Sequence, residues 1–169
     1  MNILDLPALR HPRHRTIGVT SAAVVATAVA GSLATDTSSS WYRSLTKPAI
    51  QPPGWVFPVA WTGLYASIAT VVGRNLADLQ ERGETARYQE LRNALAANLV
   101  LNAGWSALFF TGHQAGPATV EAGLLAASSA DLARRNMAVD RGRGAFLLPY
   151  AAWTAFATVL TGAIWYRNR

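Results

Sequence analysis

The chain has 169 residues, of which 51% are hydrophobic and 14% are charged, and its formal net charge is +6. Because soluble globular proteins carry about 25% charged residues, this composition argues against a soluble domain and favours a membrane protein. The sequence contains no cysteine, which excludes a disulfide framework, a thiolate nucleophile and a cysteine-ligated cluster.

Four segments lack Asp, Glu, Lys and Arg and reach the roughly 20 residues that a helix needs to cross a bilayer. They are residues 16–35, 48–73, 93–120 and 144–166. A weaker fifth candidate near residues 115–132 is interrupted by Glu121 and ended by Asp131. Both carboxylates are expected near the ends of that helix, where water reaches them. We therefore predict an all-α membrane protein, a bundle of five transmembrane helices.

The predicted elements begin with a basic N-terminal arm at residues 1–15 and a first helix at residues 16–34. Basic residues, an apolar run and the small residues 28–30 also resemble a secretory signal with its cleavage site. The uncharged run of about 20 residues is longer than a signal core of about 7–15, so we expect a retained helix. A loop at residues 35–53 follows, and the other helices are predicted at residues 54–73, 93–111, 117–133 and 145–166.

The loop and the start of the second helix form the most distinctive segment, residues 41–65. Its prolines fix φ and remove backbone donors, so the first half cannot form a regular helix. These prolines are Pro48, Pro52, Pro53 and Pro58. The aromatic residues around them are Trp41, Tyr42, Trp55, Trp61 and Tyr65. Large rings on a stiff loop beside a membrane span indicate a binding site for a flat, apolar molecule.

The third helix carries two amides, Asn98 and Asn102, near the face that presents Trp105 and Phe109. Polar groups in hydrocarbon need hydrogen-bond partners. Two interpretations stay open. The amides either hold the bundle together through interhelical hydrogen bonds, or Asn102 also supplies a polar point in an otherwise apolar pocket.

The last helix presents Tyr150, Trp153, Ala157 and Thr161 along one face, and Pro149 is expected to kink it. Three tryptophans lie too deep in their spans for an interfacial aromatic belt, so they indicate core packing or a ligand pocket. They are Trp61, Trp105 and Trp153.

The positive charge is distributed as in a membrane protein, which argues against a nucleic-acid partner. With five spans, eleven of the Lys and Arg residues share the side of the N-terminus and four lie on the other side. This asymmetry predicts a cytoplasmic N-terminus and an outward C-terminus.

Several absences narrow the function. No Walker loop is present, which argues against an ATP-driven pump. Ionisable residues are missing from the middle of the first, second, third and fifth helices, which argues against an ion-coupled transporter. The histidines His11, His14 and His113 lie outside the spans or at an end, so we expect no metal site and no bound cofactor.

Three motifs in order resemble the TspO/MBR family, the tryptophan-rich sensory proteins related to the translocator protein or peripheral-type benzodiazepine receptor. They are WY–L–KP–PP–W–F–P–W–LY at residues 41–65, LN–W–FF at residues 101–110 and LLPY–W–FA–L at residues 147–160. The resemblance covers residues 41–168. It implies five transmembrane helices, often a homodimer, and an apolar pocket enclosed by the helices and capped by the first loop.

The resemblance also implies ligands, namely porphyrins such as protoporphyrin IX and benzodiazepine-type compounds. By position it places Trp41 and Tyr42 in the lid. The pocket residues that it implies are Trp61, Asn102, Trp105, Trp153 and Ala157. Some bacterial members break down porphyrin in light, and the tryptophans matching Trp61 and Trp153 are the implied catalytic candidates. Animal members bind cholesterol, but Thr161 and Gly162 replace the Asn–Tyr pair of the family's sterol segment, which argues against sterol binding here.

The first hypothesis is therefore a membrane receptor or carrier for tetrapyrroles. The alternative is an enzyme that degrades protoporphyrin with light and oxygen, and a second alternative is a regulatory membrane scaffold. The sequence does not separate binding from turnover, because a ring that stacks on a porphyrin is the same in both.

Overall fold

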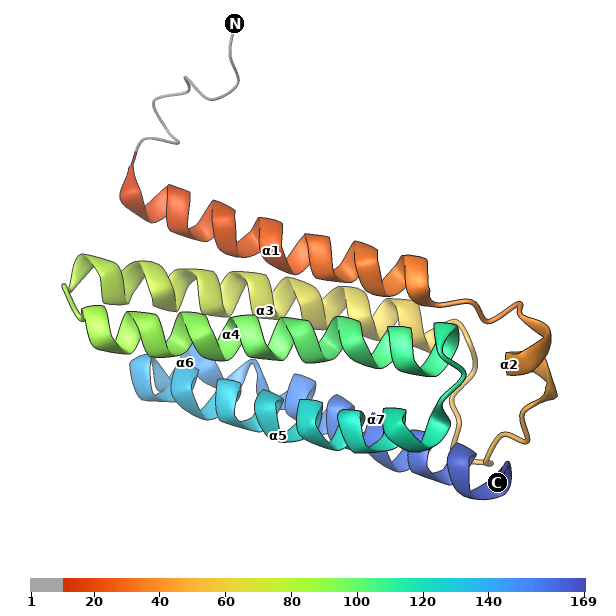
Figure 1. Ribbon diagram of the computed structural model, residues 1–169. Helices are drawn as coiled ribbons and strands as arrows, with labels where there is room; N and C mark the ends of the chain where they lie inside the picture. The colour runs from red at the N-terminus through yellow and green to blue at the C-terminus, as the bar shows by residue number, and fades with distance from the viewer. Residues whose placement is uncertain (1–10) are drawn as a thin grey trace, which may run out of the picture.

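The computed structural model describes residues 11–169, and this part of the chain is helical with connecting turns (Figure 1). The long helices are α1 (Pro12–Ala34), α3 (Val56–Glu81), α4 (Thr85–Ser106), α5 (Ala115–Val139) and α7 (Leu148–Arg167). The short ones are α2 (Ser40–Ser44), the π-helical turn η3 (Ala107–Thr111) and α6 (Arg141–Ala145). Residues 1–10, most of the predicted basic arm, lie outside the described residues. The predicted all-α class is confirmed for the described part.

Four of the helical segments in the described chain are long and apolar enough to cross a membrane. They are Pro12–Ala34, Val56–Glu81, Thr85–Thr111 and Arg141–Arg167. The helix α5 has 25 residues but is not among these four, because Glu121, Asp131 and two arginines interrupt its apolar character. The composition of the helices therefore supports four spans, and the predicted count of five is not confirmed.

The first helix begins at Pro12, earlier than the expected start at residue 16. Proline at the first helical position has a preset φ and needs no hydrogen-bond acceptor for its nitrogen. The side chain of His11 caps this end by accepting from the backbone N–H of Arg13 at 3.4 Å. At the far end of α3, Gly83 takes a φ of +70° and the chain reverses into α4.

The helix predicted at residues 145–166 corresponds to α7, which begins three residues later, at Leu148, and the predicted kink at Pro149 is wrong. The chain forms α6, turns, and restarts as α7 at Leu148, so Pro149 lies in the first turn of α7, where a missing N–H costs little. Gly144 lets α6 pack directly on the last turn of α5, because a Cβ there would lie 2.2 Å from the backbone nitrogen of Met137.

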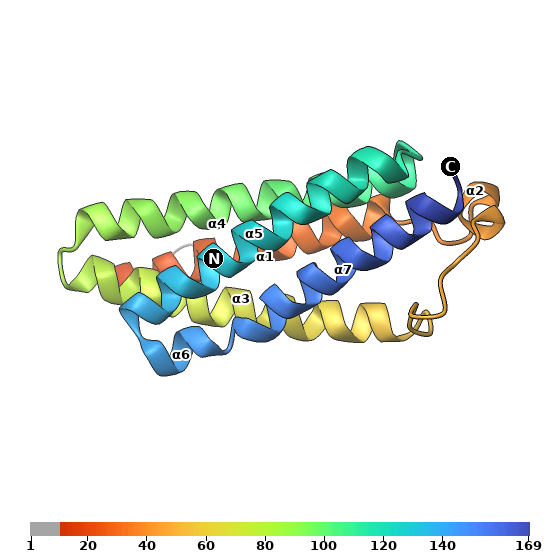
Figure 2. The ribbon, with the colours of Figure 1, turned by 90° about the horizontal axis from the view of Figure 1, so that it is seen from below.

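The long helices run alongside one another, with α1 packed on α3 and α4 and with α5 packed on α7 (Figures 1 and 2). The fully buried core lies between them and includes Ile68, Val72, Leu79, Leu132, Leu147 and Tyr150. In both views α6 and the α3–α4 turn lie at one end, and α2 and the C-terminus lie at the other. The end with α6 and the α3–α4 turn is called the basic end, and the end with α2 and the C-terminus is called the lid end.

Candidate functional site

The predicted lid folds over one end of the bundle through the short helix α2. Ser39 caps this helix by accepting from the backbone N–H of Tyr42 at 3.2 Å. The ring of Trp41 stacks on His113, with centroids 4.5 Å apart and an interplanar angle of 18°, and meets Phe109 edge-on at 5.3 Å. Tyr42 packs against Phe110 at 5.4 Å. The two lid aromatics thus lie directly on the end of α4 and η3.

Further contacts stiffen the lid around Tyr42. The ammonium of Lys47 donates to the carbonyl of Tyr42 at 2.9 Å and lies 4.5 Å from its ring centroid. The amide of Gln51 donates to the Tyr42 hydroxyl at 3.4 Å. Burial raises the pKa of the Tyr42 hydroxyl, and the hydrogen bond from Gln51 partly opposes this shift. The loop is therefore held by polar contacts as well as by its prolines.

A contact that sequence reasoning missed joins the lid to the end of α7. The backbone N–H of Thr46 donates to Asn168 Oδ1 at 2.9 Å, and Asn168 Nδ2 donates to the carbonyl of Thr46 at 3.1 Å. Asn168 Nδ2 also donates to the carbonyl of Ile164 at 2.7 Å. The two partners are 122 residues apart in the chain, so no local pattern could have predicted the pair.

The helix α4 ends in a π-helical turn that carries the aromatic floor under the lid. Trp105 stacks nearly parallel on Phe109, with centroids 5.6 Å apart and an angle of 9°, and meets Phe110 edge-on at 5.9 Å. Single π turns occur often at functional sites. The indole N–H of Trp105 is buried without a hydrogen-bond partner in the described part of the chain, and such an unpaired donor is costly unless something binds it.

A chain of hydrogen bonds crosses the centre of the bundle. Tyr65 on α3 donates its hydroxyl to Asn102 Oδ1 at 2.7 Å, and Asn102 Nδ2 donates to the Tyr150 hydroxyl on α7 at 3.1 Å. Tyr150 in turn donates to Asn98 Oδ1 at 2.8 Å, and Asn98 Nδ2 donates to Ser129 Oγ on α5 at 3.1 Å. The interhelical interpretation of the two amides is therefore confirmed. These two bonds use one N–H and one oxygen lone pair of the Asn102 amide, so the amide keeps one further donor and one further acceptor position.

Trp61 lies beside this hydrogen-bonded chain. Its ring centroid is 5.3 Å from that of Tyr65 and 6.3 Å from that of Tyr150. Trp61 is only partly buried. An exposed aromatic surface next to buried polar groups is the combination typical of ligand sites.

Trp153 connects the central aromatic residues with those under the lid. Its ring contacts Phe57 edge-on at 5.9 Å and Phe156 at 5.6 Å, and both of these phenylalanines pack in the cluster of Phe109. Trp153 itself packs against the central core. Ala157, one turn further along α7, is half-buried. Of the seven predicted lid and pocket residues, the lid pair and Trp105 lie in the cluster of Phe109, while Trp61 and Trp153 pack against the central core. Asn102 is hydrogen-bonded to Tyr65 and Tyr150 beside that core. Ala157 lies on the same helix as Trp153.

The carboxylate of Glu121 is buried, although the sequence predicted that it would be hydrated. The sequence places its carboxylate near a hydrated helix end, yet both carboxylate oxygens are buried and lack hydrogen-bond partners among residues 11–169. It lies in the second turn of α5 and faces α4, where a Cβ at Gly104 would come within 3.7 Å of Oε1. Because Gly104 has no side chain, α4 and α5 can approach closely and exclude water from Glu121.

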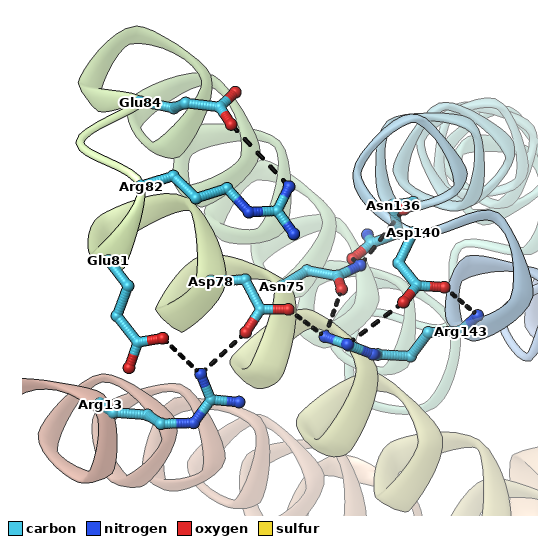
Figure 3. Close-up of polar contacts among 9 residues, drawn as sticks. All are labelled: Arg13, Asn75, Asp78, Glu81, Arg82, Glu84, Asn136, Asp140 and Arg143. Carbon is cyan, nitrogen blue, oxygen red and sulfur yellow. Dashed lines mark hydrogen bonds and ion pairs between the residues drawn. The ribbon is translucent and has the colours of Figure 1, made fainter.

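The basic end is held by a second polar cluster, which sequence reasoning also missed (Figure 3). Asp78 on α3 accepts from Arg13 of α1 at 2.8 Å and from Arg143 of α6 at 2.7 Å. Arg143 also donates to Asn75 Oδ1 at 2.8 Å, and Asn75 Nδ2 donates to Asn136 Oδ1 on α5 at 2.9 Å. These contacts join four helices at the end opposite the lid.

The chain is similar to known proteins over most of its length. The model of the TspO/MBR family matches residues 19–167. The chain is 33% identical over 129 residues to the translocator protein of Ovis aries, covering 76% of this chain and 75% of that protein. It is 32% identical over 145 residues to the tryptophan-rich protein TspO of Chlorobaculum tepidum, covering 85% and 90%. It is 34% identical over 153 residues to the protein of that name from Archaeoglobus fulgidus, covering 86% and 92%.

Proposed function

Since the chain belongs to the TspO/MBR family, we propose that it is an integral membrane receptor or carrier for a tetrapyrrole, with protoporphyrin IX as the ligand to test. The observation that carries this proposal is the position of Trp153. It contacts Phe57 and Phe156 of the cluster under the lid while packing against the core that includes Tyr150. A flat ligand that replaced these contacts would meet aromatic faces on both sides.

The lid sets how such a ligand would enter. Trp41 and Tyr42 lie over Phe109 and Phe110, so opening of the lid would uncover these two rings. Once the lid opens, Trp41, Trp105 and Trp153 exchange their contacts with neighbouring aromatic rings for contacts with the ligand. Trp105 Nε1, which has no partner in the described chain, is a donor available to a propionate or a pyrrole nitrogen. Benzodiazepine-like compounds, which are also flat and apolar, fit the same description.

The membrane topology of the proposal has five spans, with α5 as the fifth. The helix α5 lies between α4 and α7 along most of their length (Figures 1 and 2). Its exposed large apolar residues include Val120 and Leu124, which suit contact with lipid. Five spans also place Arg134 and Arg143 at the same end as Arg13, with a cytoplasmic N-terminus and an outward C-terminus. A homodimer is compatible with this arrangement.

Titration of purified protein with protoporphyrin IX, in light and in the dark, tests the proposal. Binding predicts quenched tryptophan emission with an intact porphyrin Soret band under both conditions. A new bilin-like absorbance that needs light would instead identify the chain as a porphyrin-degrading enzyme. If neither signal changes at micromolar porphyrin, the receptor hypothesis is wrong and a scaffold role remains.

A further inference from the structure

A groove on the outside of the bundle lies towards the basic end, away from the aromatic site. It has a volume of about 590 Å³ and runs between α1 and α4, with α3 beneath. Its lining includes Arg15, Val19 and Ala23 from α1 and Arg92, Leu95 and Leu99 from α4. One groove therefore combines two cationic side chains with an apolar surface.

The two arginines stand at the same level of the membrane. Arg15 directly precedes the charge-free run 16–35, and Arg92 directly precedes the charge-free run 93–120. Each is thus the last charge before its helix enters the apolar phase. Arginine at this position extends its head group to the lipid phosphates while its alkyl stem stays in the hydrocarbon.

Neither arginine of the groove is neutralised by the described part of the protein. Within residues 11–169 no carboxylate forms an ion pair with Arg15 or Arg92, whereas Arg13 and Arg135 each have acidic partners. Among residues 11–169, the side chain of Arg92 donates to the neutral amide of Asn93 at 3.3 Å. Two cations in one groove without acidic partners in this part of the chain attract an anion, and phosphate matches the donor geometry of guanidinium groups.

The apolar part of the groove continues from this charged end towards the membrane interior. Ala23 lies eight residues beyond Arg15, and Leu99 lies seven beyond Arg92, which corresponds to about 10–12 Å along each helix. Leu95 and Leu99 are buried at the bottom of the groove, while Val19 on its wall is 64% exposed. This shape suits one acyl chain lying between the two helices.

We propose that this groove binds an anionic phospholipid, with its phosphate on Arg15 and Arg92 and one acyl chain between α1 and α4. Basic pockets between transmembrane helices on the cytoplasmic side bind such head groups. Tyr88 and Gln80, which also line the groove, add polar groups beside the phosphate. A second copy of the chain fits less well, because a two-fold axis along the membrane normal would bring both arginine pairs together at one level.

Native mass spectrometry of the full-length protein, delipidated in detergent and supplied with phosphatidylglycerol or phosphatidylcholine of identical chains, tests the proposal. We expect phosphatidylglycerol to bind more tightly. The double variant Arg15→Gln/Arg92→Gln should weaken that binding on the order of thirtyfold, if each arginine contributes as basic residues near anionic lipid usually do. Porphyrin titration of the same variant checks that the bundle is intact.

The matched control is Arg74→Gln/Arg141→Gln, which removes the same charge from two exposed arginines outside the groove. It should bind phosphatidylglycerol as the unaltered protein does. An equal loss of phosphatidylglycerol binding in both double variants would show that net charge alone attracts the lipid, and this would overturn the proposal. Unchanged phosphatidylglycerol binding in Arg15→Gln/Arg92→Gln would overturn it too.

Two further measurements separate the possible occupants. Ala96→Trp, which fills the groove, should reduce phosphatidylglycerol binding without changing the oligomeric state. A loss of dimer with unchanged lipid binding would instead make this face an interface between copies and refute the proposal. Inorganic phosphate should not displace the lipid at millimolar concentration. Displacement of the lipid by phosphate would show that the acyl chain contributes nothing to binding, which contradicts the proposal.

Discussion

Thr46 in the lid and Asn168 at the end of α7 form a reciprocal pair, in which each donates one hydrogen bond to the other, at 2.9 and 3.1 Å. The pair ties the loop that carries Trp41 and Tyr42 to a helix that carries Trp153. Movement of the lid therefore requires these two hydrogen bonds to break.

Replacing Asn168 with alanine should loosen the lid without disrupting the bundle. Net contributions of such hydrogen bonds are about 0.5–1.5 kcal/mol each, so we expect porphyrin to dissociate several times faster in a stopped-flow chase. Helix content measured by circular dichroism should stay the same. Arg169→Ala, which removes a neighbouring side chain that packs on Tyr166, is the matched control. Identical dissociation rates in all three proteins would mean that the lid does not limit release.

Trp153→Phe should preserve the fold and weaken porphyrin binding. Phenylalanine keeps most of the buried area, so the free energy of unfolding should fall by about 1–2 kcal/mol at most. The smaller ring loses stacking surface and the indole donor. Trp165→Phe is the control, because Trp165 is 44% exposed near the end of α7. Unchanged porphyrin affinity and turnover in Trp153→Phe would remove this residue from the site.

Tyr150→Phe should destabilise the bundle more than it affects the ligand. The fully buried hydroxyl accepts from Asn102 Nδ2 and donates to Asn98 Oδ1, so its removal takes the partner from one buried atom of each amide. We expect a loss of about 1–3 kcal/mol, as for unsatisfied buried polar groups. Thermal unfolding in detergent measures this loss, with the exposed Tyr166→Phe as control. A melting temperature equal to that of the control would mean that water or Ser129 replaces the hydroxyl.

Any transport of porphyrin should follow its gradient. The carboxylate of Glu121 on α5 is buried and lacks a hydrogen-bond partner in the described chain, which makes it the residue to test for proton coupling. In proteoliposomes, neither a pH gradient nor a membrane potential should concentrate a neutral porphyrin analogue. The analogue must be neutral, because a charged one responds to the potential by itself. Accumulation that Glu121→Gln abolishes would make the protein a coupled transporter.

Local features of the sequence were enough for the all-α class, the four apolar spans and the family. Charge-free runs of about 20 residues indicate spanning helices whatever their neighbours are. Prolines such as Pro48 and Pro52 restrict the backbone wherever they occur, and residues 48–53 are not helical. The expectation that the whole first half of residues 41–65 is non-helical was wrong, because residues 41–44, which precede the first of these prolines, belong to α2. These signals depend on one stretch of chain at a time, so a single sequence reveals them.

Pairings between distant residues were decided only by the tertiary structure. Periodicity placed Asn98 and Asn102 on one face of α4, but it could not show that Tyr65, Tyr150 and Ser129 supply their partners. The other contacts that needed the assembled bundle are Thr46–Asn168, Arg13–Asp78–Arg143, the burial of Glu121 against Gly104 and the groove that unites Arg15 with Arg92. A helical pattern says which side chains share a face, whereas the packing of one helix on another decides what that face meets.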